Sequence, residues 1–224
     1  MISLCSVAGY ALYGGISLSH RPCGRGSLNG MDLSPSTATE SHLIGSCSTY
    51  FIRKRGIYLK NIHGQEGFNY WEISTMSMHM WKIEILPRDY GQPFPDDKVK
   101  ECFFVPNGGK RQVIDLEKEG YPEQWMDVMQ PDIIVRDWYS TKPNFTSTYF
   151  AHVVLLSKKK EAIQDFLPGL QSDLKWTQIE YRFRHYGPGV RYIHFEHGAG
   201  DMGRPKGARV TNSSITIEPE DLST

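Results

Sequence analysis

Along most of the chain, apolar residues fall into short runs with the length and period of β-strands. In residues 81–86, the apolar Trp81, Ile83 and Ile85 alternate with charged residues, which is the two-residue period of a half-buried strand. Similar runs predict further strands at residues 111–116, 132–140, 175–186, 190–197 and 208–218. The run at residues 147–157 is apolar at both parities and therefore predicts a central strand covered on both faces.

The connections between these runs carry helix, turn and bulge signals. Residues 122–129 begin with Pro followed by Glu, which favours a short helix. The sequence GPG at residues 187–189 favours a turn between two strands. In the last run, the parity of the apolar positions changes between Val210 and Ile215. We therefore expect a β-bulge at Asn212–Ser214.

Many short strands with one short helix predict an all-β, antiparallel β-sandwich. Residues 1–48 differ from the rest, because they contain ten Ser and seven Gly and no sustained apolar period. Such a segment buries too little apolar surface to offset its ordering entropy, so we expect a disordered tail. The sandwich domain is expected at residues 49–219, followed by a C-terminal tail at residues 220–224.

Composition narrows the classes of function. Lys plus Arg and Asp plus Glu number 25 each, so the chain lacks the basic excess that a nucleic-acid binder uses against phosphate. No apolar run reaches the roughly 18 residues that a membrane-spanning helix needs. The four cysteines form no CxxC pair, which favours reduced thiols in a cytoplasmic protein over a disulfide framework or a zinc finger.

The candidate chemical groups do not assemble into an active site. His194 and His197 stand three apart on a predicted strand, so they point to opposite faces and cannot chelate one metal ion. Cys102 lies beside two Phe residues and is predicted to be a buried thiol rather than a nucleophile. Trp138 and Tyr139 lie in a β-rich run, and we expect Trp138 in the core. We expect no catalytic residue, no metal site and no cofactor.

Four motifs in order resemble the F-box-associated domain. This domain is the C-terminal module of the sugar-binding F-box-only proteins. It also occurs in the nonspecific cytotoxic cell receptor protein, a relative that lacks the F-box. They are RQVIDLEKEGYPEQWMD, QPDIIVRDWYS, HYGPGVRYIHFEHG and GARVTNSSITIEP, at residues 111–127, 130–140, 185–198 and 207–219. The resemblance runs from about Tyr50 to Pro219 and implies an antiparallel, jelly-roll-like β-sandwich with one or two short helices.

The resemblance also implies a function in two parts. In the family, an N-terminal F-box docks on the Skp1 adaptor of a cullin-type ubiquitin ligase. The sandwich captures misfolded glycoproteins through the inner core of their N-linked, high-mannose glycans, which leads to their degradation. In this sequence, residues 1–48 do not resemble an F-box. A glycoprotein or another protein client is therefore the expected partner, and a Skp1–cullin assembly is not expected from these residues.

The same resemblance points to candidate ligand residues in two places. The family's sugar-binding loop carries adjacent Tyr and Trp followed by Lys, whereas here residues 198–210 read GAGDMGRPKGARV and contain no aromatic residue. Asp201, Arg204 and Lys206 are the polar candidates in this loop. The family's second sugar-contacting Phe corresponds to Val105 or, with a shift of one residue, to Phe104.

Three interpretations remain open from the sequence. The chain is a substrate-recognition module for glycoproteins, a glycan-blind protein-interaction module, or a product in which an F-box exon has been replaced. Retention on immobilised chitobiose or high-mannose glycoprotein distinguishes the first two.

Overall fold

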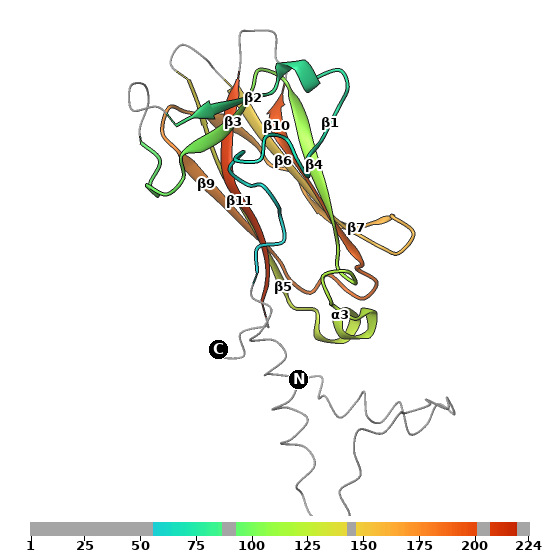
Figure 1. The fold of residues 1–224 in the computed structure, drawn as a ribbon. Helices are drawn as coiled ribbons and strands as arrows, with labels where there is room; N and C mark the ends of the chain where they lie inside the picture. Colours follow the sequence, from blue (N-terminus) through green and yellow to red (C-terminus); the bar gives the residue numbers. More distant parts are fainter. Residues whose placement is uncertain (1–55, 87–92, 143–146, 201–206, 219–224) are drawn as a thin grey trace, which may run out of the picture. The chain divides into compact units, whose positions relative to one another are not determined.

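The computed structural model describes residues 56–86, 93–142, 147–200 and 207–218, and most of its regular structure is β-strand (Figure 1). The predicted tails at residues 1–48 and 220–224 lie outside the described residues. The strands are β1 (Glu72–Ile73), β2 (Lys82–Ile85), β3 (Glu101–Val105), β4 (Gly108–Asp115), β5 (Asp132–Thr141), β6 (Ser147–Leu156), β7 (Ala162–Phe166), β8 (Gly169–Ser172), β9 (Thr177–Phe183), β10 (Tyr192–Gly200) and β11 (Ala208–Glu218). A 3₁₀ turn, η1 (Met78–Met80), and a helix, α3 (Glu123–Met129), complete the described elements.

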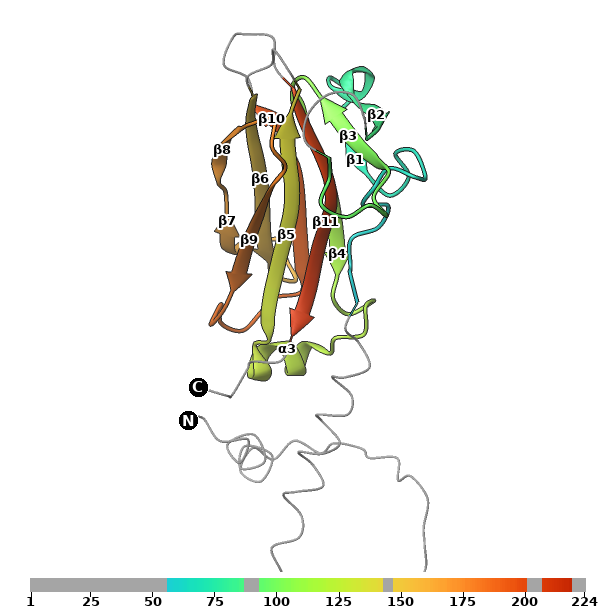
Figure 2. The same ribbon diagram turned by 90° about the vertical axis from the view of Figure 1, so that its left-hand side faces the viewer.

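The strands form two sheets that stack face to face (Figures 1 and 2). The first sheet has the order β1-β4-β10-β6-β7, with β8 also paired to β6, and the second has the order β2-β3-β11-β5-β9. Every pairing is antiparallel. The predicted all-β sandwich with short helical elements is therefore confirmed. No helix among the described residues is long and apolar enough to cross a membrane.

Alternation along the central strands builds the core between the sheets. On β5, Ile133 and Val135 point inward and are fully buried, and Ile193 and Phe195 do the same on β10. Burying side chains of this size stabilises the fold by about 1.5–3 kcal/mol each, before conformational entropy is counted. The two inner faces supply the cluster that holds the sandwich together.

The prediction that Trp138 belongs to this core is wrong. Tyr139 takes the inward position on β5, and Trp138 points outward, where it is half-buried against Phe94, with ring centroids 5.2 Å apart. The reason is parity, since successive residues of a strand face opposite sides of the sheet. Trp138, Phe94 and Trp176 form an outer aromatic layer on this face of β5. The ring centroids of Trp176 and Phe94 lie 5.2 Å apart.

Two other structural predictions agree with the structure. The register of β11 against β5 shifts between Thr211 and Ser214, where Asn212 has a φ of 52°, so the bulge is confirmed. The helix α3 follows Pro122, whose φ of −61° suits the first turn. The helix ends at Gln130 in the left-handed conformation.

Two burial predictions need correction. β6 is central, but only its inner face is fully covered, because Phe150 and His152 on its outer face are half-buried. On β2, Trp81 precedes a strand that lies at the edge of its sheet, and Ile85 is 78% exposed. The continuous apolar run at residues 147–157 therefore predicted the central position of β6 correctly, but the prediction that the outer face of this strand is also fully covered is wrong.

Candidate functional site

The connection from β10 to β11 crosses from one sheet to the other at one end of the sandwich. β10 ends at Gly200 and β11 begins at Ala208. The hydroxyl of Thr141 donates a hydrogen bond of 2.8 Å to the carbonyl of Gly207, which fixes the chain where it enters β11. Asp201, Arg204 and Lys206 lie outside the described residues, so their role as ligand contacts stays a prediction.

The other two candidates, Phe104 and Val105, lie near this end on β3 but are buried. Val105 faces the core and has no exposed surface. Phe104 is 5% exposed on the outer face, where the ammonium of Lys142 lies 3.9 Å from its ring centroid. Lys142 in turn forms an ion pair with Glu84, and Gly207 packs so closely that a side chain there would clash with the Phe104 ring. In the structure, neither Phe104 nor Val105 offers a surface to a sugar.

A buried polar cluster joins the two sheets in the interior. Asp137 of β5 accepts hydrogen bonds from the Tyr149 hydroxyl at 2.6 Å and from the Ser213 hydroxyl at 2.8 Å. Its Oδ2 also lies 2.5 Å from Nδ1 of His197. Since Asp137 and His197 have no exposed side-chain surface, this cluster holds the sheets in register and cannot meet a ligand.

Burial shifts the titration of the groups in this cluster. It lowers the pKa of His197, and the neighbouring Asp137 carboxylate opposes the shift. It also raises the pKa of Tyr149 well above its ordinary value. The imidazole of His197 stacks on Trp71, with centroids 5.1 Å apart and planes inclined by 11°. A neutral imidazole that donates from Nδ1 to Asp137 fits these surroundings.

Lys110 is the least expected member of the interior. Its side chain is 1% exposed, and Nζ lies 2.9 Å from the centroid of the Trp71 ring and 3.6 Å from that of Phe103. Among the described residues, Nζ has no hydrogen-bond acceptor. Burial lowers the pKa of Lys110 well below its ordinary value, and Asp137 offsets this only in part.

The histidine and cysteine predictions agree with this arrangement. His197 points into the interior and is fully buried, whereas His194 lies on the outer face and pairs with Glu196 at 3.5 Å. Cys102 has no exposed surface, and burial raises the pKa of its thiol to about 12. A thiol with such a pKa is not a nucleophile near neutral pH.

The sequence motifs contained Asp137 and His197 without revealing that they meet. Asp137 on β5 and His197 on β10 belong to different sheets, and the packing of the two sheets brings these residues, 60 positions apart, into contact. A polar residue at an inward parity position on a buried strand was the one available signal. Lys110 carried the same signal, because it stands two residues before Gln112 on the inner face of β4.

Residues 53–217 match the sequence model of the family described as the F-box associated region. The chain belongs to this family. The match covers the whole described sandwich apart from Glu218, and it agrees with the motifs at residues 111–127 and 207–219.

The chain is also similar in sequence to curated F-box only proteins. The chain is 41% identical to human F-box only protein 44 over 182 residues, which cover 76% of this chain and 71% of that protein. It is 39% identical to bovine F-box only protein 2 over 183 residues, covering 76% and 62%. It is 37% identical to human F-box only protein 6 over 183 residues, again covering 76% and 62%.

Among solved structures, the enzymatically active domain of tailspike protein 4 of bacteriophage CBA120 is similar in fold. The TM-score is 0.51 at 15% identity, with 72% of this chain and 21% of that chain covered. At this identity the likeness concerns the fold alone.

Proposed function

We propose that this chain is a substrate-recognition module that binds N-glycosylated, misfolded client proteins for ubiquitin-dependent degradation in the cytoplasm. It has no active site of its own, and ubiquitin transfer belongs to a ligase complex. The observation that carries the proposal is the match of residues 53–217 to the F-box associated region, together with about 40% identity to F-box only proteins across the sandwich.

The connection between β10 and β11 is the proposed glycan contact. Asp201, Arg204 and Lys206 supply a carboxylate, a guanidinium and an ammonium that can hydrogen-bond sugar hydroxyls. Each such bond contributes only about 0.5–1.5 kcal/mol, because water competes for the same groups. Without an aromatic platform, we expect binding that is specific but weak.

Assembly with Skp1 and a cullin is not proposed for residues 1–48, because they lack the helical apolar pattern of an F-box. We expect no tight binding of Skp1 by this chain. A pull-down of Skp1 that depends on residues 1–48 would contradict this expectation.

A second candidate is a glycan-blind module that binds its client through protein surface. The burial of Phe104 and Val105 favours this candidate, because neither residue supplies a sugar platform. The absence of aromatic residues after Phe195 points the same way. The client would then be recognised whether or not it is glycosylated.

Retention on an immobilised high-mannose glycoprotein, before and after its N-glycans are removed, separates the two candidates. The glycan proposal predicts retention that disappears with the glycans and that falls in the Lys206→Ala variant. The Lys159→Ala variant is a matched control, since it removes an exposed Lys that lies in neither proposed site. Equal retention of both forms of the glycoprotein would favour the glycan-blind module.

A further inference from the structure

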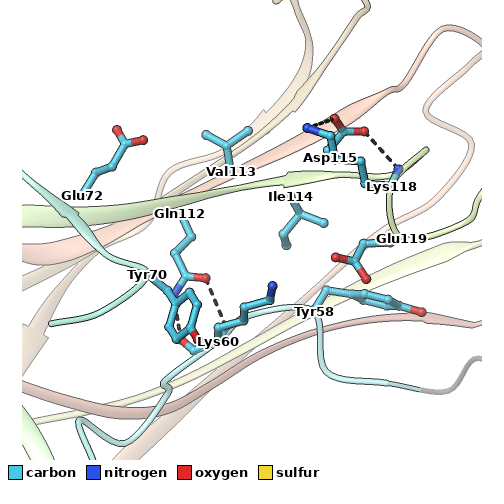
Figure 3. Close-up of a pocket in the computed structure, with 10 residues that line it drawn as sticks. All are labelled: Tyr58, Lys60, Tyr70, Glu72, Gln112, Val113, Ile114, Asp115, Lys118 and Glu119. Carbon is cyan, nitrogen blue, oxygen red and sulfur yellow. Dashed lines mark hydrogen bonds and ion pairs between the residues drawn. The ribbon is translucent and has the colours of Figure 1, made fainter. Parts of the chain in front are cut away.

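A groove of about 310 Å³ lies beside β4, on the side that faces away from β10 and beyond the end of β1 (Figure 3). β4 forms one wall and the segment at residues 58–60 forms the other (Figure 3). Tyr70 lies at one end, and the turn at residues 115–119 lies at the other. The volume falls within the range of about 300–1,000 Å³ that is usual for ligand pockets.

The register of β4 leaves one of its backbone positions open toward this groove. Leu116 donates its N–H to the carbonyl of Arg191, so the residues of β4 that bond to β10 are those of even number. The N–H and C=O of Val113 therefore point away from β10 and toward the groove. Asp115 has the same orientation, but its carbonyl already accepts a hydrogen bond from Glu119.

The strand that would cover Val113 stops before reaching it. β1 contains only Glu72 and Ile73, and the pairing of Glu72 with Arg111 would place Tyr70 opposite Val113. Tyr70 instead has a φ of 71°, which turns the chain out of the extended conformation. Among the described residues, none pairs with Val113 on this side.

The opposite wall of the groove is held in place by a side chain. The amide of Gln112 accepts the N–H of Lys60 at 3.1 Å and donates to the Lys60 carbonyl at 2.7 Å. These two hydrogen bonds resemble the backbone bonds between paired strands. Because the Gln112 side chain makes them, the segment at residues 58–60 stays too far from β4 to pair with its backbone. The groove is therefore preformed, which reduces the ordering cost of binding.

Tyr70 presents an aromatic surface at the mouth of the groove. Its side chain is 57% exposed, and the ammonium of Lys60 lies 5.5 Å from the ring centroid. A large residue in the left-handed conformation is strained, and such strain is concentrated at functional positions. The ring offers an apolar contact beside the open hydrogen-bonding groups of Val113.

The charges around the groove are balanced. Glu72 pairs with Arg111 at 3.0 Å, and Asp115 pairs with Lys118 at 3.3 Å. Lys60 contacts the Tyr70 ring. Since no single sign of charge prevails, the groove favours an occupant without net charge.

We propose that this groove binds a short, uncharged, extended segment of a client polypeptide, which pairs with β4 at Val113 as an added strand and packs on Tyr70. An N–H and a C=O side by side on an open strand match the backbone of another extended chain, which is the chemistry of strand addition. This second site is independent of the proposed glycan contact, so either one can fail without the other.

Amide hydrogen exchange of the full chain tests the proposal, with the blocked peptide acetyl-Thr-Val-Thr-Val-Thr-amide as the probe. In the free protein, we expect the Val113 amide to exchange at least roughly tenfold faster than those of Gln112 and Ile114, which bond to β10. Saturation with the peptide should slow Val113 selectively. Chitobiose should leave its exchange unchanged.

Two variants and one control make the test specific. Tyr70→Gly removes the ring and relieves the strained φ, so it should unfold no more readily than the wild type while losing roughly tenfold in peptide affinity. Val113→Pro removes the open N–H without removing a hydrogen bond to β10, and it should show the same loss, with an unchanged urea midpoint as evidence that the variant still folds. Leu167→Ala is the control, because Leu167 lies between β7 and β8, outside the groove, and is 60% exposed. This variant should bind the peptide as tightly as the wild type does.

Any one of four results would overturn the proposal. The Val113 amide is already protected in the free chain, or the peptide binds without slowing its exchange. The peptide binds the Tyr70→Gly variant as well as the wild type, or chitobiose protects Val113 in place of the peptide.

Discussion

Asp137 is the central residue of the buried polar cluster between the two sheets. It faces the core at a position where its neighbours on β5 are apolar, and it receives hydrogen bonds from Tyr149 and Ser213 and contacts His197. A buried carboxylate with three partners is satisfied, whereas the buried amine of Lys110 is not.

Replacing Lys110 with Met is expected to stabilise the fold. The substitution removes an amine that has no described acceptor and keeps a flexible side chain of similar length between Trp71 and Phe103. We expect the free energy of unfolding to rise by about 1–3 kcal/mol, measured by urea titration. Lys60→Met, at an exposed position, is the control and should change it little. A destabilised Lys110→Met variant would show that the amine makes a favourable contact.

Stability should fall as the pH drops below about 6.5, because burial lowers the pKa of His197 in the folded state from its ordinary 6.5. The unfolded chain then takes up a proton before the folded chain does. The stabilisation is complete above pH 6.5 and is lost toward the folded-state pKa, at up to about 1.4 kcal/mol per pH unit. Urea titrations from pH 5 to pH 8 should show a smaller slope for His197→Gln than for the wild type, and equal slopes would contradict the assignment.

Trp138 and Tyr139 should differ in their contribution to stability. Tyr139 is 5% exposed and stacks on Tyr149 at 4.3 Å, so Tyr139→Ala should cost about 3–5 kcal/mol. Trp138 is half-buried on the outer face, so Trp138→Ala should cost only about 1–2 kcal/mol. Denaturant midpoints of the two variants provide the comparison. An equal loss would mean that the outer aromatic layer is as well packed as the core.

At the scale of elements, alternation predicted the long strands and the short strand β2, and it missed β1, β3, β7 and β8. β5, β6, β10 and β11 were predicted because their apolar positions extend over many residues. β8, with only four residues, gave too little pattern to distinguish it from a loop.

The candidate site was less predictable than the fold. Phe104 was chosen by its place before β4, but its burial depends on Lys142 and Gly207, which lie far away in sequence. Contacts of this kind depend on which strands become neighbours, and no local pattern specifies them. The open edge at Val113 likewise follows from the register of β1 and β10, which only the structure gives.

Several ion pairs attach the helix α3 to the sandwich, and the pair between Asp127 and Arg191 can be tested by substitution. Asp127 accepts two hydrogen bonds of 2.8 Å from the guanidinium of Arg191 and one of 2.7 Å from the N–H of Gly189. Asp127→Ala should therefore lower the free energy of unfolding by about 1.5–3 kcal/mol. Lys158→Ala removes a pair with Glu123 at a site where Lys158 is 75% exposed, and it should leave the urea midpoint nearly unchanged. Equal urea midpoints for these two variants would contradict this account of the helix.

At the scale of the whole molecule, the chain combines the fold of its family with two proposed recognition sites. The sandwich of the F-box associated region is present, and its interior is closed by the Asp137 cluster. We therefore expect recognition to use loops and edges, because the described interior offers a ligand no exposed polar group. The connection at residues 201–206 and the groove beside Val113 are the two places proposed for it.

Calorimetric titration of the full chain with chitobiose tests the central claim most directly. The account predicts saturable but weak binding, because the connection at residues 198–210 contains no aromatic residue. Placing Tyr and Trp there, as Met202→Tyr and Gly203→Trp, should strengthen the binding by roughly a hundredfold. A double variant that binds chitobiose no more tightly than the unmodified chain would contradict the account of the loop. No binding by either form would contradict glycan recognition by this chain.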